Sequence, residues 1–320
     1  MNLRLRYFLK EYVVLIIMII FIIIASFLSK EFLSVVNITN LLRQTTMVII
    51  VGCAVNLLMV SGGVDLSVGS IVALSAIVLV KLVANNTGFP LVLAIIIAIL
   101  AGLLCGLVNA FLIVKLNINA LISTLGTLYI FRGLTFIISD SKTISTGLPD
   151  FFEVIGQGFL WKIPNPVIIM IFIFIIFLFL QDWTTLGKYS YAIGGNLEAA
   201  RLSGVPIEKV QTILYVLVGL MSGITGVIVA SRAASAGPLV SQGFEFDVIL
   251  AVLLGGTVLG GGGGSVKGML FGALLLSVVR NGMNLLGLES TYKYITTGAV
   301  FVLAILLNKL IRGEKIINFK

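Results

Sequence analysis

The chain is organised as a series of apolar runs, each about 20 residues long, separated by short polar segments. A helix needs a run of that length to cross the hydrocarbon core of a bilayer. We therefore expect an all-α fold, a polytopic transmembrane bundle of about ten spans that forms one domain over residues 1–320. The predicted spans are 12–28, 44–61, 67–84, 90–114, 118–139, 166–181, 211–230, 246–261, 266–283 and 291–310.

Charged residues are scarce: they make up 11% of the chain, while hydrophobic residues make up 59%. A soluble domain carries about 25% charged residues, so too few are present to cover a surface that faces water. The apolar residues are expected to face a lipid bilayer. The net charge of +8 fits Lys and Arg in cytoplasmic loops beside anionic lipid. No basic run with interleaved aromatic residues occurs, so no nucleic acid partner is expected.

The N-terminal segment sets the expected orientation. Arg4, Arg6 and Lys10 precede the first apolar run, which is long for a signal-peptide core and is followed by no convincing cleavage site. It is interpreted as the first span, with its basic flank in the cytoplasm. An even number of spans then places both termini in the cytoplasm, residues 140–165 outside and residues 182–210 inside.

Glycine marks two further features of the chain. The separators at 61–67 and 261–266 are short and Gly-rich, so one of them is expected to interrupt a helix rather than to join two complete spans. Glycines at four-residue spacing predict helices whose backbones approach closely in lipid. They are Gly102 and Gly106, Gly219 and Gly223, and the series Gly260, Gly264, Gly268 and Gly272.

The segment from Asn196 to Pro206 is predicted to form a short helix with both ends specified. Asn196 is a good N-cap, and Glu198 lies in the first turn, where the helix dipole favours a negative charge. Gly204 is placed for a left-handed C-cap, and Pro206 prevents continuation. A short capped helix between two spans suits a mechanical contact with another protein. An ordinary loop helix explains the pattern equally well.

Residues 61–70, Ser-Gly-Gly-Val-Asp-Leu-Ser-Val-Gly-Ser, place an acid near membrane depth. Asp65 is the only acid between Glu31 and Asp140. An ionisable group at the bilayer centre costs about 2.5–3.5 kcal/mol on insertion scales. Ser67 is placed to cap the helix that follows. Two interpretations stay open: Asp65 has a role inside the membrane, or the segment is a surface turn with Asp65 in water.

Four blocks carry a family resemblance. Glu198-Ala199-Ala200, followed after three residues by Gly204, resembles the EAA signature of bacterial ABC importer permeases. Residues 61–70, 244–264 and 281–287 resemble, in order, the blocks of ribose-type (monosaccharide) permeases. The likeness runs from about residue 44 to residue 308. It departs after Gly204, where Val205-Pro206 replaces the hydrophobic-x-Leu-Pro ending of the signature.

The resemblance implies the membrane-spanning permease subunit of an ATP-driven importer in the bacterial inner membrane. The implied cargo is a monosaccharide, with ribose as the first guess, or a similar sugar signal. The implied partners are a cytoplasmic ATP-binding subunit, an extracytoplasmic sugar-binding protein and a second permease copy. In that family the EAA segment docks on the ATPase, which implies coupling roles for Asn196, Glu198, Ala199, Ala200, Arg201 and Gly204.

ATP and Mg are expected on the partner ATPase, and no cofactor is expected in this chain. The only Gly-Lys pair, Gly187-Lys188, is followed by Tyr189, so the phosphate-binding pattern G-x-x-x-x-G-K-S/T is absent. An ion-coupled secondary transporter is the alternative; it would need carboxylates inside the helices, and only Asp65 comes close. An enzyme is not expected, because the chain has no histidine and its cysteines, Cys53 and Cys105, lie in apolar runs that predict burial.

Polar residues within or beside the spans are the candidates for the transport pathway. The predicted pathway or gate residues are Asn56, Asp65, Ser67, Glu245, Asp247 and Asn284. Asn109, Phe244 and Phe246 are further candidate sugar contacts, although packing or helix capping explains such residues as well. Arg232, at the predicted outer end of the seventh span, is the predicted docking residue for the binding protein. Contact with a lipid headgroup is the competing interpretation.

Overall fold

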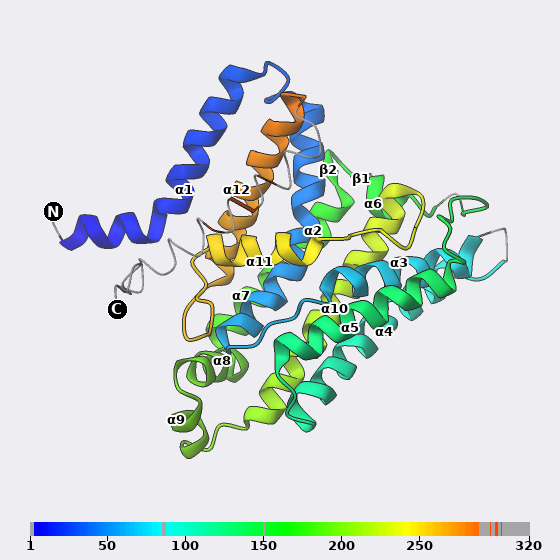
Figure 1. Ribbon diagram of the computed structural model, residues 1–320. Helices are drawn as coiled ribbons and strands as arrows, with labels where there is room; N and C mark the ends of the chain where they lie inside the picture. The colour runs from blue at the N-terminus through cyan, green and yellow to red at the C-terminus, as the bar shows by residue number, and fades with distance from the viewer. Residues whose placement is uncertain are drawn as a thin grey trace.

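The structure is a computed structural model that describes residues 3–84, 88–149 and 151–287, together with residues 295, 298, 299 and 302 (Figure 1). The fold is helical, and its one sheet in this part of the chain is a two-stranded antiparallel hairpin. The helices are α1 Leu3–Leu28, α2 Val35–Val60, α3 Val68–Val83, α4 Leu91–Ala110, α5 Ala120–Ile138, α6 Val154–Gln157, α7 Asn165–Trp183, α8 Thr185–Gly195, α9 Leu197–Leu202, α10 Ile207–Ala233, α11 Phe244–Leu254 and α12 Val266–Leu285. A π-helical turn, η2 Phe111–Lys115, extends α4, and the hairpin consists of β1 Phe159–Leu160 and β2 Ile163–Pro164.

The predicted helical membrane fold is confirmed, but the predicted number of spans is not. Within the described residues, six helices are long and apolar enough to cross a membrane: α2, α4 with η2, α5, α7, α10 and α12. The apolar part of α1, Val14–Phe27, and the helix α3 are shorter. The predicted span at 291–310 lies outside the described residues.

The predicted span at 246–261 is wrong, because α11 ends at Leu254. Its 11 residues give a length of about 16 Å, whereas the hydrocarbon core is about 30 Å thick. Residues 255–265, here called the glycine loop, are irregular, since Gly256, Gly260 and Gly261 have φ angles of 87°, 99° and 98° that no right-handed helix contains. The interruption thus lies earlier than the 261–266 separator suggested.

Glycine seams join the helices as the four-residue spacing predicted, with one exception. A Cβ atom on Gly102 of α4 would lie 2.6 Å from the carbonyl oxygen of Gly219 on α10, so the two backbones touch. Gly268 and Gly272 bring α12 against α11 in the same way. The series was expected to continue through Gly260 and Gly264, but both lie in the glycine loop and form no helix seam.

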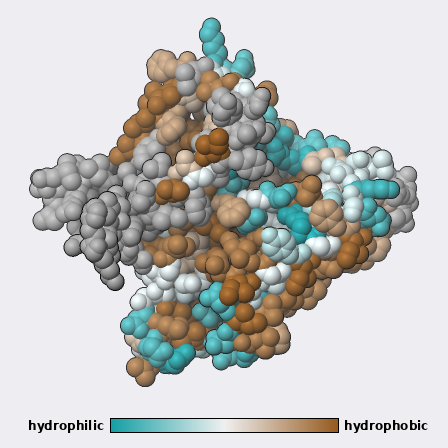
Figure 2. Space-filling view, viewed as in Figure 1, coloured by the Kyte–Doolittle hydropathy of each residue, from teal (hydrophilic) through white to brown (hydrophobic). Residues whose placement is uncertain are grey.

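Apolar side chains cover much of the surface, as a lipid environment requires. Figure 2 shows hydrophobic residues over wide areas, and hydrophilic residues gathered at the lower tip, where Figure 1 places α9. The exposed side chains on α4 and α7 include Leu100, Leu104, Phe172, Ile175 and Phe179. By contrast, α3 is buried along most of its length, so it forms the centre of the bundle.

The two long connections lie at opposite ends of α10. Residues 140–165 carry α6 and the hairpin, and the amide of Gly156 donates to Ser231 Oγ at 2.7 Å, which fixes α6 against the end of α10. Residues 182–210 carry α8 and α9 next to the start of α10. The prediction of a short helix in the second connection is confirmed, while α8 was not predicted.

Candidate functional site

The helix α9 has the capping that its sequence predicts. The side chain of Asn196 accepts a hydrogen bond from the amide of Ala199 at 3.0 Å. The helix ends at Leu202 with Ser203 as its C-cap, and Gly204, the next residue, has a left-handed φ of 78°. Glu198 and Arg201 form an exposed ion pair at 3.0 Å on one face of the helix, while Ala200 on the other face is buried. The helix therefore rests on the bundle through Ala200 and presents charged groups outward.

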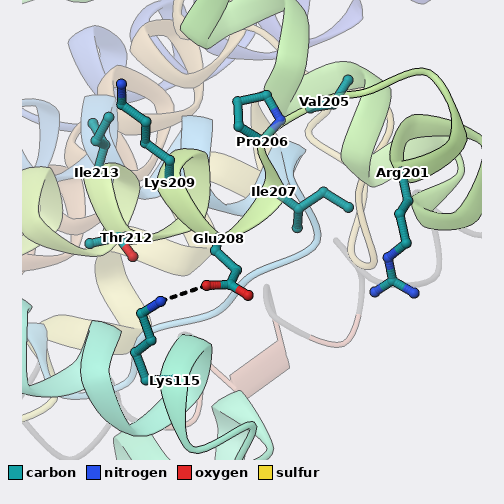
Figure 3. A pocket seen from close by; sticks show the side chains of 9 residues that line it. All are labelled: Lys115, Arg201, Val205, Pro206, Ile207, Glu208, Lys209, Thr212 and Ile213. Carbon is teal, nitrogen blue, oxygen red and sulfur yellow. Dashed lines mark hydrogen bonds and ion pairs between the residues drawn. The ribbon is translucent and has the colours of Figure 1, made fainter.

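A cavity of about 650 Å³ lies beside the loop that joins α9 to α10 (Figure 3). Lys115 Nζ and Glu208 Oε2, which line this cavity, are 2.6 Å apart. This ion pair connects the π-helical turn η2, after α4, to the start of α10. Both side chains are exposed, so the pair adds little to stability. The cavity has apolar walls with basic groups around them, and its lining residues are Lys115, Arg201, Val205, Pro206, Ile207, Glu208, Lys209, Thr212 and Ile213.

Residues 61–67, here called the aspartate turn, are organised by a buried carboxylate. Asp65 Oδ1 accepts the amide of Ser67 at 2.8 Å and its hydroxyl at 2.6 Å. Asn109 Nδ2, from α4, donates to Asp65 Oδ2 at 3.0 Å and to Ser67 Oγ at 2.8 Å. All three side chains are fully buried. The interpretation of a surface turn with Asp65 in water is therefore wrong, and Ser67 binds Asp65 instead of capping α3.

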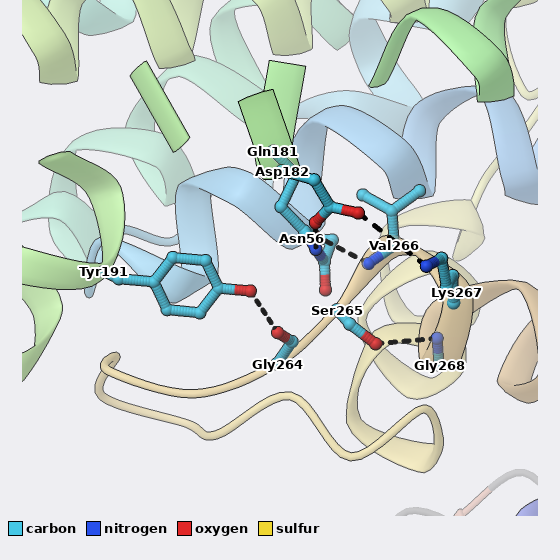
Figure 4. Close-up of polar contacts among 9 residues, drawn as sticks. All are labelled: Asn56, Gln181, Asp182, Tyr191, Gly264, Ser265, Val266, Lys267 and Gly268. Atoms are coloured by element: carbon cyan, nitrogen blue, oxygen red, sulfur yellow. Dashed lines mark hydrogen bonds and ion pairs between the residues drawn. The ribbon is translucent and has the colours of Figure 1, made fainter. Parts of the chain in front are cut away.

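A second group of buried polar residues lies where α2, α7, α12 and the glycine loop meet (Figure 4). Asn56 Nδ2 donates to Gln181 Oε1 at 3.3 Å, and Asn56 Oδ1 accepts the hydroxyl of Thr257 at 2.6 Å. Gln181 Oε1 also accepts the amide of Val266 at 2.8 Å. Asn56, a predicted pathway residue, thus holds helices together in this conformation.

The acidic residues of α11 face its neighbours. Asp247 forms a bidentate ion pair with Arg280 of α12, and the two side chains are mostly buried. Glu245 is buried beside Gly69 of α3, and its Oε2 has no hydrogen-bond partner within the described residues. Asn284, near the end of α12, is exposed. Glu245 and Asp247 lie on α11 and Asn284 lies on α12, and the three residues do not form one pocket with the aspartate turn.

Two arginines lie together at the end of α10 that is remote from α9. Arg232 is half-buried, and the like charge of Arg43, on α2, acts on it. Arg43 donates to the carbonyl oxygen of Gln157 and lies 4.6 Å from the ring centroid of Phe159. Within the described residues, no acidic side chain pairs with Arg232 or Arg43.

Comparison with known proteins identifies the family of this chain. A family model described as the permease component of branched-chain amino acid transport systems matches residues 37–305. The chain is 41% identical to the ribose import permease protein RbsC of Bacillus subtilis (strain 168) over 291 residues, which cover 91% of this chain and 90% of the relative. The chain belongs to this permease family.

Other relatives agree with that assignment. The permease is 37% identical to RbsC of Escherichia coli (strain K12) over 310 residues, 95% of its own chain and 96% of the relative. It is 38% identical to the L-arabinose transport system permease protein AraH of the same strain over 299 residues, 93% and 90% of the two chains. No solved structure matches the permease. Such proteins are multi-pass components of the bacterial inner membrane and are not enzymes.

Several residues of these sites were missed by the sequence analysis. Gln181, Tyr191, Arg43 and Arg280 were not singled out. Gln181 and Arg280 did carry a signal, because a polar side chain inside an apolar run needs a partner. The partner itself could not be read from the sequence: Gln181 and Val266 are far apart in the chain and meet only in the fold.

Proposed function

We propose that the permease is the membrane-spanning subunit of an ATP-driven importer of a monosaccharide, with ribose as the first candidate. The observation that carries this proposal is the 41% identity over 91% of the chain to a ribose import permease. The capped helix α9, which presents Glu198 and Arg201 outward, supports an ATPase contact at Asn196, Glu198, Ala199, Ala200, Arg201 and Gly204. No comparison favours the alternative, an ion-coupled secondary transporter.

In the proposed assembly both termini stay in the cytoplasm, which needs an even number of membrane crossings per chain. The predicted count of about ten included residues 246–261, where α11 is too short to cross, so the proposal keeps the orientation and not the count. Cytoplasmic ATP-binding subunits, which hold ATP and Mg, contact α9 and the adjoining cavity. An extracytoplasmic sugar-binding protein delivers the sugar to the opposite face. Each permease copy offers few polar groups, so we place the pathway between two copies, identical or closely homologous, because a two-fold axis doubles the polar lining.

The pathway residues remain a prediction. We place Asn56, Asp65, Ser67, Glu245, Asp247 and Asn284 nearer the pathway or its gates than the lipid. Of these, Asn284 is exposed and the others are at least partly buried, so the pathway must open for them to be reached. Cysteine at Ser67 or Asn284, with Cys53 and Cys105 replaced by Ala, should react with water-soluble thiol reagents in at least one nucleotide state. Failure of both positions to react in every state, with transport intact, would refute the placement.

The proposed function is tested by uptake into proteoliposomes that contain the permease with its ATPase and binding protein. Radiolabelled D-ribose should enter only with internal ATP, and an ionophore should not prevent uptake. Uptake that needs an ion gradient and survives without ATP would support the secondary transporter. L-arabinose, tested beside D-ribose, separates the two sugars that the names of the relatives suggest.

The ATPase contact is tested at the left-handed position that ends α9. Gly204→Val places a β-branched residue at a φ of 78° and should misplace α9. We expect uptake and sugar-stimulated ATP hydrolysis to fall at least tenfold, with normal membrane insertion; the strain corresponds to about 1–2 kcal/mol. Gly204→Asn is the matched control, because Asn tolerates this conformation and should retain most of the activity. Full transport by Gly204→Val would contradict the proposed ATPase contact of α9.

Docking of the binding protein is tested at Arg232. An arginine with no acidic partner in the described residues suits a carboxylate on another protein. Arg232→Glu should weaken the complex far more than Arg232→Lys, and the difference should be larger at low salt. Equal affinities for the two variants, measured on the permease in nanodiscs, would favour the lipid-headgroup interpretation.

A further inference from the structure

The helices α8 and α9 are joined by a single residue. Asn196 is the C-cap of α8 and the N-cap of α9, with an extended backbone at φ −158° and ψ 107°. Its amide donates to the carbonyl oxygen of Ala192 at 3.1 Å, while its side chain caps α9. There is no slack segment between the two helices. A displacement of α9 is therefore passed directly to α8.

Backbone atoms in the last turn of α8 lie directly against backbone atoms of the glycine loop and of the end of α2. A Cβ atom on Gly194 would overlap the carbonyl oxygen of Val60 and lie 2.5 Å from the amide nitrogen of Gly262. A Cβ atom on Gly261 would lie 2.8 Å from the Cα atom of Gly194. The amide of Gly262 donates to the carbonyl oxygen of Val60 at 2.9 Å. With no side chains between them, these segments cannot shift past each other without changing the contact.

Polar contacts carry this connection from α7 and α8 to the start of α12 (Figure 4). The hydroxyl of Tyr191 donates to the carbonyl oxygen of Gly264 at 2.5 Å. Burial, with the nearby charge of Asp182, raises the pKa of Tyr191, so the phenol keeps its proton and stays a donor. Gln181 accepts the first amide of α12, that of Val266, and Lys267 Nζ lies 3.7 Å from Asp182 Oδ2.

The helix α12 carries the contact across the bundle. Its 20 residues give a rod of about 30 Å. Near its far end, Arg280 pairs with Asp247 of α11, and Asn281 exchanges two amide hydrogen bonds with Asn37 of α2, at 2.9 and 2.8 Å. A shift at the start of α12 thus acts on the acidic end of α11, where we place gate residues.

We propose that Tyr191 and Gln181 are positioning residues that transmit the displacement of α9 to α12 through the glycine loop. The proposal rests on the proposed function, since it needs an ATPase that moves α9. Tyr191 attaches the loop to the α8–α9 unit, and Gln181 attaches the first turn of α12 to α7. Loss of either bond leaves ATP hydrolysis in place and separates it from movement of the gate.

The test measures transport and hydrolysis separately in the full assembly of permease, ATPase and binding protein. Tyr191→Phe removes only the hydroxyl, and Tyr189→Phe, on the same helix, is the matched control. A second pair is Gly194→Ala, whose Cβ would overlap Val60, against Gly195→Ala, whose Cβ meets nothing within 4 Å. We expect D-ribose uptake per ATP hydrolysed to fall about five- to tenfold in Tyr191→Phe, the loss of one hydrogen bond, and further in Gly194→Ala. Both controls should match the parent.

A second readout follows the far end of α12. In a background with Cys53 and Cys105 replaced by Ala, Asn284→Cys is labelled with a water-soluble thiol reagent, with and without ATP. The rate should depend on ATP in the parent and lose that dependence in Tyr191→Phe and Gln181→Met. Parent-like uptake per ATP and ATP-dependent labelling in these variants would overturn the transmission role, and so would loss of assembly in Tyr191→Phe, which would make the bond purely structural. If the parent itself shows no ATP-dependent uptake, the proposed function fails instead.

Discussion

The aspartate turn and the glycine loop are both irregular segments, but they are held in place by different kinds of contact. Both are irregular segments beside a helix too short to cross the membrane, α3 in one case and α11 in the other. The aspartate turn is held by side chains, with Asp65 bonded to Ser67 and Asn109. The glycine loop meets α8 through backbone atoms, with Tyr191 and Gln181 bonding to it or to the residue that follows it.

This difference in contacts suggests that the two segments behave differently during transport. A buried carboxylate with several donors fixes one geometry, because any movement leaves a buried polar group unpaired. The contact between α8 and the glycine loop is held mainly by shape, with one backbone hydrogen bond from Gly262 to Val60, so a shift of this part of the loop breaks fewer buried bonds. We therefore expect the aspartate turn to stay fixed while the glycine loop shifts during transport. Three pairs of substitutions test this expectation.

The largest effect is expected from Asp65→Ala. Removing the carboxylate leaves Asn109 and the amide of Ser67 without their partner in a fully buried site, at about 1–3 kcal/mol for each unsatisfied group. The detergent-solubilised permease should lose several degrees of thermal stability or fail to accumulate, as measured by fluorescence-detected size-exclusion chromatography. The control is Asp140→Asn, because Asp140 is exposed and, among the described residues, its ion pair is with the exposed Lys81. Asn tolerates the φ of 53° at this position, so the control removes the charge without adding backbone strain. Equal stability of the two variants would show that the aspartate turn is not fixed by its carboxylate.

A smaller effect on folding, but a clear one on transport, is expected from Gly261→Ala. Its neighbour Gly260 has nearly the same φ, 99° against 98°, so both substitutions carry the same backbone strain. They differ in contact: a Cβ on Gly261 would lie 2.8 Å from Gly194 of α8 and 2.9 Å from the amide nitrogen of Gly62 in the aspartate turn, whereas one on Gly260 meets nothing within 4 Å. D-ribose uptake should fall severalfold more in Gly261→Ala than in Gly260→Ala, at similar thermal stability. Indistinguishable uptake would mean that contact with α8 does not matter.

The smallest effect is expected when one hydroxyl is removed from each segment. Ser67→Ala removes a hydroxyl that bonds both Asp65 and Asn109, while Thr257→Val removes the donor to Asn56. Hydrogen bonds to charged groups contribute about 1.5–3 kcal/mol, and neutral ones about 1 kcal/mol. Ser67→Ala should therefore lower the unfolding temperature more than Thr257→Val does. The reverse order would contradict the assignment of the aspartate turn as the more firmly fixed segment.

The sequence predicted what depends on local chemistry. The caps of α9 at Asn196 and Gly204 follow from residues a few positions apart, and both are confirmed. The burial of Cys53 and Cys105 followed from the apolar runs around them and is confirmed as well. The seam between Gly102 and Gly219 was half predicted: the spacing indicated close packing but could not name the partner helix.

What the sequence could not supply is pairing over long separations. Residues 246–261 are apolar enough for a span, yet several positive φ angles in the glycine run end the helix at Leu254, and hydropathy does not register backbone conformation. The partners of Asp65 and Gln181 lie on other helices, so the pattern around each residue left its environment open. Only the fold distinguishes a buried Asp65 from a solvated one.

The shared cap at Asn196 has a consequence for chain length. Because Asn196 alone joins α8 to α9, the number of residues in α8 sets the direction in which α9 leaves it. One residue added before Asn196 would lengthen α8 by about 1.5 Å and move the attachment point of α9 by about 100° around the α8 axis, which takes Ala200 away from its buried position. Insertions and deletions at this junction should therefore be far less tolerated than substitutions, because the joint sets how α9 lies against the bundle.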